Sequence, residues 1–304
     1  MTDRRSFIKK TLLGTTLLGV SSFPFESFAA TKPVKLTILH TNDMHSRIDP
    51  FPKDDEKYGG MGGMAKRATV IDKIREDVEH VLLLDAGDIF QGTPYFNLYG
   101  GELEFKLMSA MGYDAATLGN HDFDNGLKGL HRQLPHASFP FLTANYDFQG
   151  TILQDTFQPY KIFDKGSIKV GVFGLGIELS GLVADKHFGK TKYRDPIATA
   201  QEMVKTLREN GCHFVVCLSH LGFKYQSNKV SDQVLAKNVN GIDLIIGGHT
   251  HTFLEQPEQL LSPDGHVVYI NQVGFGGINL GRIDCIFERK NRKRIEQSSL
   301  TGIF

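Results

Sequence analysis

Short apolar runs alternate with amphipathic stretches along most of the chain. The runs are rich in Val, Ile, Leu and Phe, and nearly all of them end in a glycine-rich or polar segment, as buried strands do. Predicted strands cover residues 34–40, 81–85, 114–118, 139–144, 169–174, 213–219 and 242–246. Between them, apolar residues recur three or four positions apart, which predicts helices over residues 63–75, 102–111, 127–134, 197–209 and 230–239. This alternation predicts an α/β fold.

The C-terminal part of the chain has a different pattern. Over residues 267–287, short alternating runs are broken by glycines, which predicts a closing meander at the edge of a sheet. The basic run at residues 289–294 is typical of a solvated terminus, and its alternative is a contact with an anion or a partner.

Composition limits the function classes. The 304 residues are 40% hydrophobic and 22% charged, so the chain can bury a sizeable core, and we expect one large domain. Lys and Arg together number 34, as do Asp and Glu, so no overall field attracts nucleic acid or an anionic membrane. An anionic substrate must therefore be held locally. The cysteines at positions 212, 217 and 285 are too few for a disulfide framework, and we expect them to be buried and unpaired.

Residues 1–29 have the pattern of an export signal. Basic residues at positions 4, 5, 9 and 10 precede an apolar run over residues 11–20, and small residues follow near Ala29. The run is about half as long as a membrane span requires, so we expect cleavage after Ala29 and no membrane anchor afterwards. Residues 4–9 resemble a twin-arginine signal, with an ordinary secretory signal as the alternative. Either signal places the mature chain, residues 30–304, in the periplasm or otherwise outside the cytoplasm.

Polar side chains with metal-ligand chemistry follow five of the predicted strands. In an α/β sheet the functional site lies beyond the carboxyl ends of the strands. In chain order, these positions hold Asp43, His45, Asp88, Asn120, His220, His249 and His251. A single histidine is more often a surface or core residue, and a single Asp is often a helix cap, but chance does not readily explain five such strand ends. Carboxylate, amide and imidazole ligands without thiolate suit Mn, Fe, Zn, Co or Mg.

These residues form motifs that resemble those of the calcineurin-like metallophosphoesterases and, within them, the 5′-nucleotidase family. In order, the motifs are Asp43-Met44-His45, Gly87-Asp88, Gly119-Asn120-His121-Asp122, His220 and Gly248-His249-Thr250-His251. They span nearly the whole mature chain. The resemblance implies a four-layer α-β-β-α sandwich with two mixed sheets, and a site at the strand ends of the two facing sheets.

The resemblance also implies roles for individual residues. One divalent metal ion would bind Asp43, His45 and His251, the other would bind Asn120, His220 and His249, and Asp88 would bridge both. Two such cations polarise a phosphoryl group and lower the pKa of a coordinated water, so that hydroxide attacks phosphorus in line with the leaving oxygen.

Two further residues have implied catalytic roles. His121 would stabilise the transferring phosphoryl group or protonate the leaving group, and Asp124 would orient the His121 imidazole. The alternative for Asp124 is a cap of the helix that follows.

We therefore expect an exported metal-dependent phosphoesterase that hydrolyses nucleotides or similar phosphomonoesters. The alternatives are a cyclic-nucleotide or nucleotide-sugar phosphodiesterase, a sulfur-ester hydrolase of the thiosulfate-oxidising type, and a metal-dependent binding subunit. Typical 5′-nucleotidases carry a second, C-terminal domain that binds the nucleoside. None is visible before Phe304, so a separate substrate-binding chain could supply it.

Overall fold

The computed structural model describes residues 33–289 and 292–304. The predicted export signal at residues 1–29 lies outside this part of the chain, as do residues 290 and 291 of the basic run. Within the described ranges, no helix is both long and apolar enough to cross a membrane.

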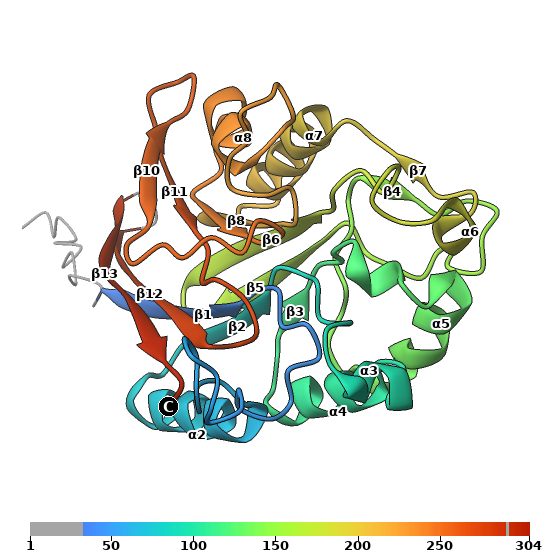
Figure 1. Ribbon diagram of the computed structural model, residues 1–304. Helices are drawn as coiled ribbons and strands as arrows, with labels where there is room; N and C mark the ends of the chain where they lie inside the picture. The colour runs from blue at the N-terminus through green and yellow to red at the C-terminus, as the bar shows by residue number, and fades with distance from the viewer. Residues whose placement is uncertain (1–32, 290–291) are drawn as a thin grey trace, which may run out of the picture. The chain divides into compact units, whose positions relative to one another are not determined.

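Two mixed β-sheets make up the centre of the fold (Figure 1). The first has the strand order β13-β12-β1-β2-β3 and the second β10-β11-β9-β8-β6-β5. The first sheet contains β1 (Val34–Thr41), β2 (Val81–Asp85), β3 (Ala115–Ala116), β12 (Asn279–Arg289) and β13 (Arg292–Gly302). The second contains β5 (Tyr160–Lys165), β6 (Ile168–Leu175), β8 (Phe214–Ser219), β9 (Leu244–Gly247), β10 (Glu258–Leu261) and β11 (Val267–Asn271). The short strands β4 (Tyr146–Asp147) and β7 (Lys192–Tyr193) pair with each other.

Helices cover the outer faces of both sheets, with α2 and α4 against the first sheet and α7 and α8 against the second (Figure 1). The helices are α2 (Met64–Asp77), α3 (Pro94–Tyr99), α4 (Glu102–Ala110), α5 (Gly126–Gln133), α6 (Asp185–Phe188), α7 (Pro196–Glu209) and α8 (Asp232–Asn238). Two 3-10 turns, η1 (His121–Phe123) and η2 (Leu134–His136), flank α5.

Strand β8 shows why the sequence forms this layered arrangement. Its Val216 and Leu218 side chains belong to the core between the two sheets, whereas Val215 and Cys217 pack in the core beneath α7 and α8. A strand that is buried on both faces must be apolar at successive positions, which is the pattern that predicted it. The predicted four-layer α-β-β-α sandwich is therefore confirmed, and the three cysteines are buried and free as expected.

The direction of the strands positions the site. In the first sheet β1, β2 and β3 are parallel, and in the second β6, β8 and β9 are parallel. Parallel neighbours end at the same edge of a sheet, so the loops that follow them begin side by side.

Two predicted elements are wrong. Residues 139–144 form only isolated bridges at Phe141 and Leu142, because Pro140 has no N–H for a strand ladder and the aromatic side chains pack in the core near α4 instead. Residues 267–287 do not form one meander, because β11 belongs to the second sheet and β12 to the interior of the first. Gly274, Gly276 and Gly277 have positive φ angles, which lets the connection turn from one sheet to the other.

The predicted solvated character of the basic run is also wrong at Lys293. Its ammonium group lies 2.5 Å from the carboxylate of buried Asp243, which precedes β9. The same carboxylate accepts hydrogen bonds from Arg208 of α7 and from the Val215 N–H, and His266 lies 3.0 Å away. Asp243 therefore connects α7 and both sheets.

Replacement of Asp243 by Asn should lower the free energy of unfolding by about 2 kcal/mol at pH 7, since it leaves Arg208 and Lys293 without their anionic partner while both remain partly exposed. Urea unfolding measures the effect, with exposed Asp54→Asn as the control. Burial alone would raise the pKa of Asp243, but the hydrogen bond with His266 and the charges of Lys293 and Arg208 lower it.

The contribution of Asp243 is consequently complete above the ordinary carboxyl pKa of about 4 and is lost as the pH falls through the lowered folded-state pKa. The difference between the Asp243→Asn variant and the wild type should narrow below about pH 4. A variant as stable as the wild type at pH 7 contradicts this account.

Candidate active site

The structure brings all nine predicted site residues together at the carboxyl ends of the parallel strands. Asp43 and His45 follow β1, and Asp88 follows β2. Asn120, His121 and Asp124 follow β3, His220 follows β8, and His249 and His251 follow β9. Two groups among these residues have the geometry to hold a metal ion.

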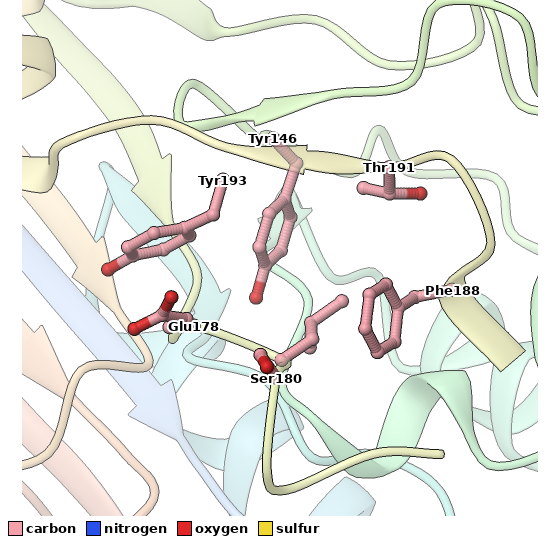
Figure 2. Close-up of a pocket in the computed structure, with 7 residues that line it drawn as sticks. Tyr146, Glu178, Ser180, Phe188, Thr191 and Tyr193 are labelled. Carbon is pink, nitrogen blue, oxygen red and sulfur yellow. The ribbon is translucent and has the colours of Figure 1, made fainter. Parts of the chain in front are cut away.

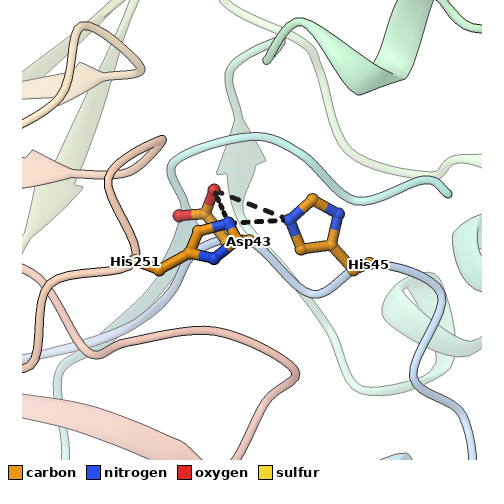
Figure 3. Close-up of side chains that lie close together, drawn as sticks. All are labelled: Asp43, His45 and His251. Atoms are coloured by element: carbon orange, nitrogen blue, oxygen red, sulfur yellow. Dashed lines mark hydrogen bonds and ion pairs between the residues drawn. The ribbon is translucent and has the colours of Figure 1, made fainter. Parts of the chain in front are cut away.

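The first group consists of Asp43, His45 and His251 (Figure 3). The Nε2 atoms of the two imidazoles are 2.9 Å apart, and Asp43 Oδ1 lies 3.4 Å from the His251 nitrogen and 4.0 Å from that of His45. Asp43 is fully buried, whereas both histidines are partly exposed. The group therefore combines a buried anion with two nitrogens that border solvent.

The second group consists of Asp88, His220 and His249. His220 Nε2 lies 3.1 Å from Asp88 Oδ2, and both side chains are buried. Asn120 joins this group, because its Oδ1 atom is 2.8 Å from His249 Nδ1. Asn120, His220 and His249 thus lie together, with Asp88 beside them.

Unusual backbone conformations aim these side chains. Asp43, His45, Asp88, His249 and His251 all have φ between 50° and 70°. For residues with a Cβ this left-handed conformation costs about 1 kcal/mol or more, and such strain collects at functional sites. Gly87 allows the loops to approach, since a Cβ there would lie 2.5 Å from the Gly119 nitrogen.

The donor set fits divalent metal ions. His220 Nδ1 lies 2.7 Å from the Ala86 carbonyl and His45 Nδ1 lies 3.1 Å from that of Gln91, so in each ring Nδ1 carries the proton and Nε2 presents a lone pair. Buried His220 Nε2 has no hydrogen-bond partner and faces the Asp88 carboxylate. Two acceptors in contact require a proton or a cation between them.

The pKa values of His220 and His249 also show how strongly burial and nearby charges act on these two imidazoles. Burial acts to lower the pKa of His220, but the charge of Asp88 and its hydrogen bond, together with the charge of Asp43 and the Ala86 carbonyl, raise the pKa to about 10. His249 shows the opposite shift, because burial lowers its pKa to about 4. A cation bound at each group would satisfy both imidazoles without a proton.

His121 and Asp124 form a hydrogen-bonded pair beside the two groups. Asp124 Oδ2 lies 2.8 Å from His121 Nδ1, and the His121 ring contacts the His45 ring edge-on at 5.3 Å. Asn125, not Asp124, occupies the N-cap position of α5. The alternative role of Asp124 as a helix cap is therefore wrong.

The family model of calcineurin-like phosphoesterases matches residues 36–253, a range that contains every residue of this site. The chain belongs to that family. This result confirms the resemblance on which the fold and the site were predicted.

Relatives and solved structures support the same placement. The phosphoesterase chain is 37% identical to a snake venom 5′-nucleotidase of Gloydius brevicauda over 294 residues, which cover 90% of this chain and 49% of the relative. Among solved structures it is similar to the 5′-nucleotidase precursor of Thermus thermophilus, with a TM-score of 0.80, 31% identity and coverage of 88% and 54%. It is also similar to the NAD nucleotidase of Haemophilus influenzae, with a TM-score of 0.79, 28% identity and coverage of 90% and 51%. The chain thus spans about half the length of these proteins.

Asp122 supports the phosphoesterase site, a role that the sequence analysis did not assign. Its carboxylate accepts hydrogen bonds from the N–H groups of Gly119 and Asp88 on one oxygen and from Ile89 and Phe90 on the other. Burial, followed by the charge of Asp88, raises the pKa of Asp122 to about 7. Asp122 therefore fixes the loop that carries Asp88 to the loop that carries Asn120.

Two pockets differ in their relation to this site. One, of about 310 Å³, borders His45, His121 and His251 and thus opens directly onto the site. The other, of about 250 Å³, has Tyr146, Phe188, Thr191 and Glu178 in its lining (Figure 2).

Replacement of Asp122 by Asn should weaken binding of Mn²⁺ by roughly 10- to 100-fold, because the amide presents a donor to backbone N–H groups and loosens the Asp88 loop. Titration calorimetry measures the affinity, and exposed Asp164→Asn is the control. An unchanged affinity in a folded Asp122→Asn variant would show that the Asp88 loop does not need this support.

Proposed function

We propose that the chain is a divalent-metal-dependent phosphomonoesterase that hydrolyses nucleotides. The carrying observation is the pair of groups, Asp43/His45/His251 and Asp88/His220/His249, next to the hydrogen-bonded His121 and Asp124. The 5′-nucleotidases and NAD nucleotidase to which the chain is similar support a nucleotide as the substrate.

Each group would hold one metal ion through the side chains described above. Asn120 would complete the second group, and Asp88 would face both ions. The bound ions supply Lewis acidity, which polarises the phosphoryl group and lowers the pKa of water. The buried Asp43 and Asp88 carboxylates would offset part of the charge of the ions. The chain has no net charge, so an anionic substrate would be attracted mainly by the metal ions.

His121 would act on the leaving group. Its Nδ1 is bonded to Asp124, so Nε2 is available to hold a proton at the pocket that borders the site. The hydrogen bond with Asp124 raises the pKa of His121 above its ordinary value, which favours the protonated imidazole. A protonated His121 can stabilise the phosphoryl oxygens and then transfer its proton to the leaving oxygen.

The proposal includes export. The basic and apolar pattern of residues 1–29 would direct the chain out of the cytoplasm, and residues 30–304 would be the mature catalytic domain. The proposal also includes a separate chain that would bind the substrate and contribute to its selection.

The function is tested by phosphate release from AMP and p-nitrophenyl phosphate by the mature chain loaded with Mn²⁺. His121→Ala should lower kcat/KM by roughly a hundredfold or more while Mn²⁺ content stays unchanged. Exposed His131→Ala, on α5, is the matched control. If neither ester is hydrolysed although both metal ions are bound, the phosphomonoesterase assignment fails.

Asp124→Asn should move the alkaline limb of the pH profile of kcat/KM to lower pH. Activity that needs protonated His121 declines as the pH rises through the pKa of His121, and loss of the Asp124 carboxylate lowers that pKa. The profile is measured from about pH 5 to about pH 10, which extends about three pH units above the ordinary histidine pKa of about 6.5. If the alkaline limb of the Asp124→Asn variant stays at the wild-type pH, the titration of His121 does not cause that limb.

A further inference from the structure

The pocket that borders His121 has one wall that the mechanism does not use. Besides histidines of the site, this pocket of about 310 Å³ is lined by Arg47, Phe51 and Phe275. A phosphoryl group held at the two metal groups would extend its ester substituent away from them, and this pocket is open space beside His121. Its remaining lining should therefore meet the leaving group.

Arg47 supplies the positive charge of this wall. Its guanidinium lies 4.0 Å from the centre of the Phe51 ring, in the geometry of a cation–π contact. Asp49 and Asp55 influence it only at longer range, and in the described residues the guanidinium forms no hydrogen bond or ion pair. A positioned guanidinium with unused donors is suited to a phosphoryl oxygen.

Phe275 supplies a flat apolar surface. Its ring stacks on His251 at 5.2 Å with an interplanar angle of 18°, and it is only partly buried. The neighbouring Gly276 N–H donates a hydrogen bond of 2.7 Å to the Asp43 carbonyl, which fixes the loop at the site. Gly276 must also lack a Cβ, because that atom would lie 2.9 Å from the Phe51 ring.

The second pocket is a weaker candidate for the same role. Glu178 lines it and would repel a dianionic phosphoester, and its lining includes none of the predicted metal ligands (Figure 2).

We infer that the pocket lined by Arg47 and Phe275 is a leaving-group subsite within the catalytic domain itself. Phe275 stacks against a planar leaving group such as a nucleobase, and Arg47 binds an oxygen of the phosphoryl group. This inference rests on the proposed function and makes it more specific, because it gives the domain its own preference for nucleoside monophosphates over aliphatic phosphates.

Binding of the two products, adenosine and inorganic phosphate, tests the roles of Phe275 and Arg47 independently and needs no turnover. The Mn²⁺-loaded chain is titrated with adenosine and with inorganic phosphate by calorimetry. Phe275→Leu should weaken adenosine binding roughly tenfold and leave phosphate binding within about twofold. Arg47→Ala should weaken phosphate binding roughly tenfold and leave adenosine binding within about twofold. Arg47→Lys should recover part of the loss, since a point charge replaces the fork of donors.

Matched controls are Phe188→Leu, in the second pocket, and exposed Arg132→Ala, neither of which should change either affinity. The inference is overturned if the wild type does not bind adenosine at millimolar concentration. It is also overturned if Phe188→Leu, rather than Phe275→Leu, weakens adenosine binding. It is also overturned if Phe275→Leu lowers both affinities together with Mn²⁺ content, because Phe275 would then act only through His251. Since these titrations need no catalysis, their result is independent of whether the phosphomonoesterase assay succeeds.

Discussion

Hydrogen bonds between loops of the two sheets hold the candidate site together. The Asp43 carboxylate, after β1, accepts the N–H of His249, after β9, at 3.0 Å. In the other direction, His220 after β8 is bonded through Nδ1 to the Ala86 carbonyl after β2. Neither sheet alone contains a complete ligand group, so the apolar core between the sheets is a precondition of the site. That core offsets the strained backbone at the ligand positions.

Electrostatics then explains why so many titratable groups can share a buried region. His220 and Asp88 are both inaccessible, and the charge of Asp88 is the largest of the causes that raise the pKa of His220. Around them, burial raises the pKa of Asp85 and of Asp122 to about 7. An excess of carboxylates with unprotonated imidazole nitrogens is unfavourable in a protein interior unless cations are present. Divalent ions bound at these groups would offset the carboxylate charges and coordinate the imidazole nitrogens.

Features of the fold and the site that depend on local sequence patterns were predictable, whereas those that depend on contacts between residues far apart in the sequence were not. Strands such as β8 and the positions of the candidate ligands that follow them were predictable, because burial on both faces leaves a local apolar pattern and the site lies at a fixed place relative to it. The role of Asp122 was not, because it bonds N–H groups more than thirty positions away in sequence. Lys293 looked like part of a solvated tail, since its partner Asp243 is adjacent only in the folded chain. Residues 139–144 have the composition of a strand, and only Pro140 and the surrounding aromatic packing decide otherwise.

The most direct test of the account is a crystal structure of the Mn²⁺-loaded protein with anomalous scattering data. We expect two manganese peaks, one coordinated by Asp43, His45 and His251 and the other by Asp88, His220 and His249 with Asn120. A single peak, or peaks away from these side chains in a protein of confirmed metal content, would contradict the central claim that the loops of the two sheets form a two-metal centre.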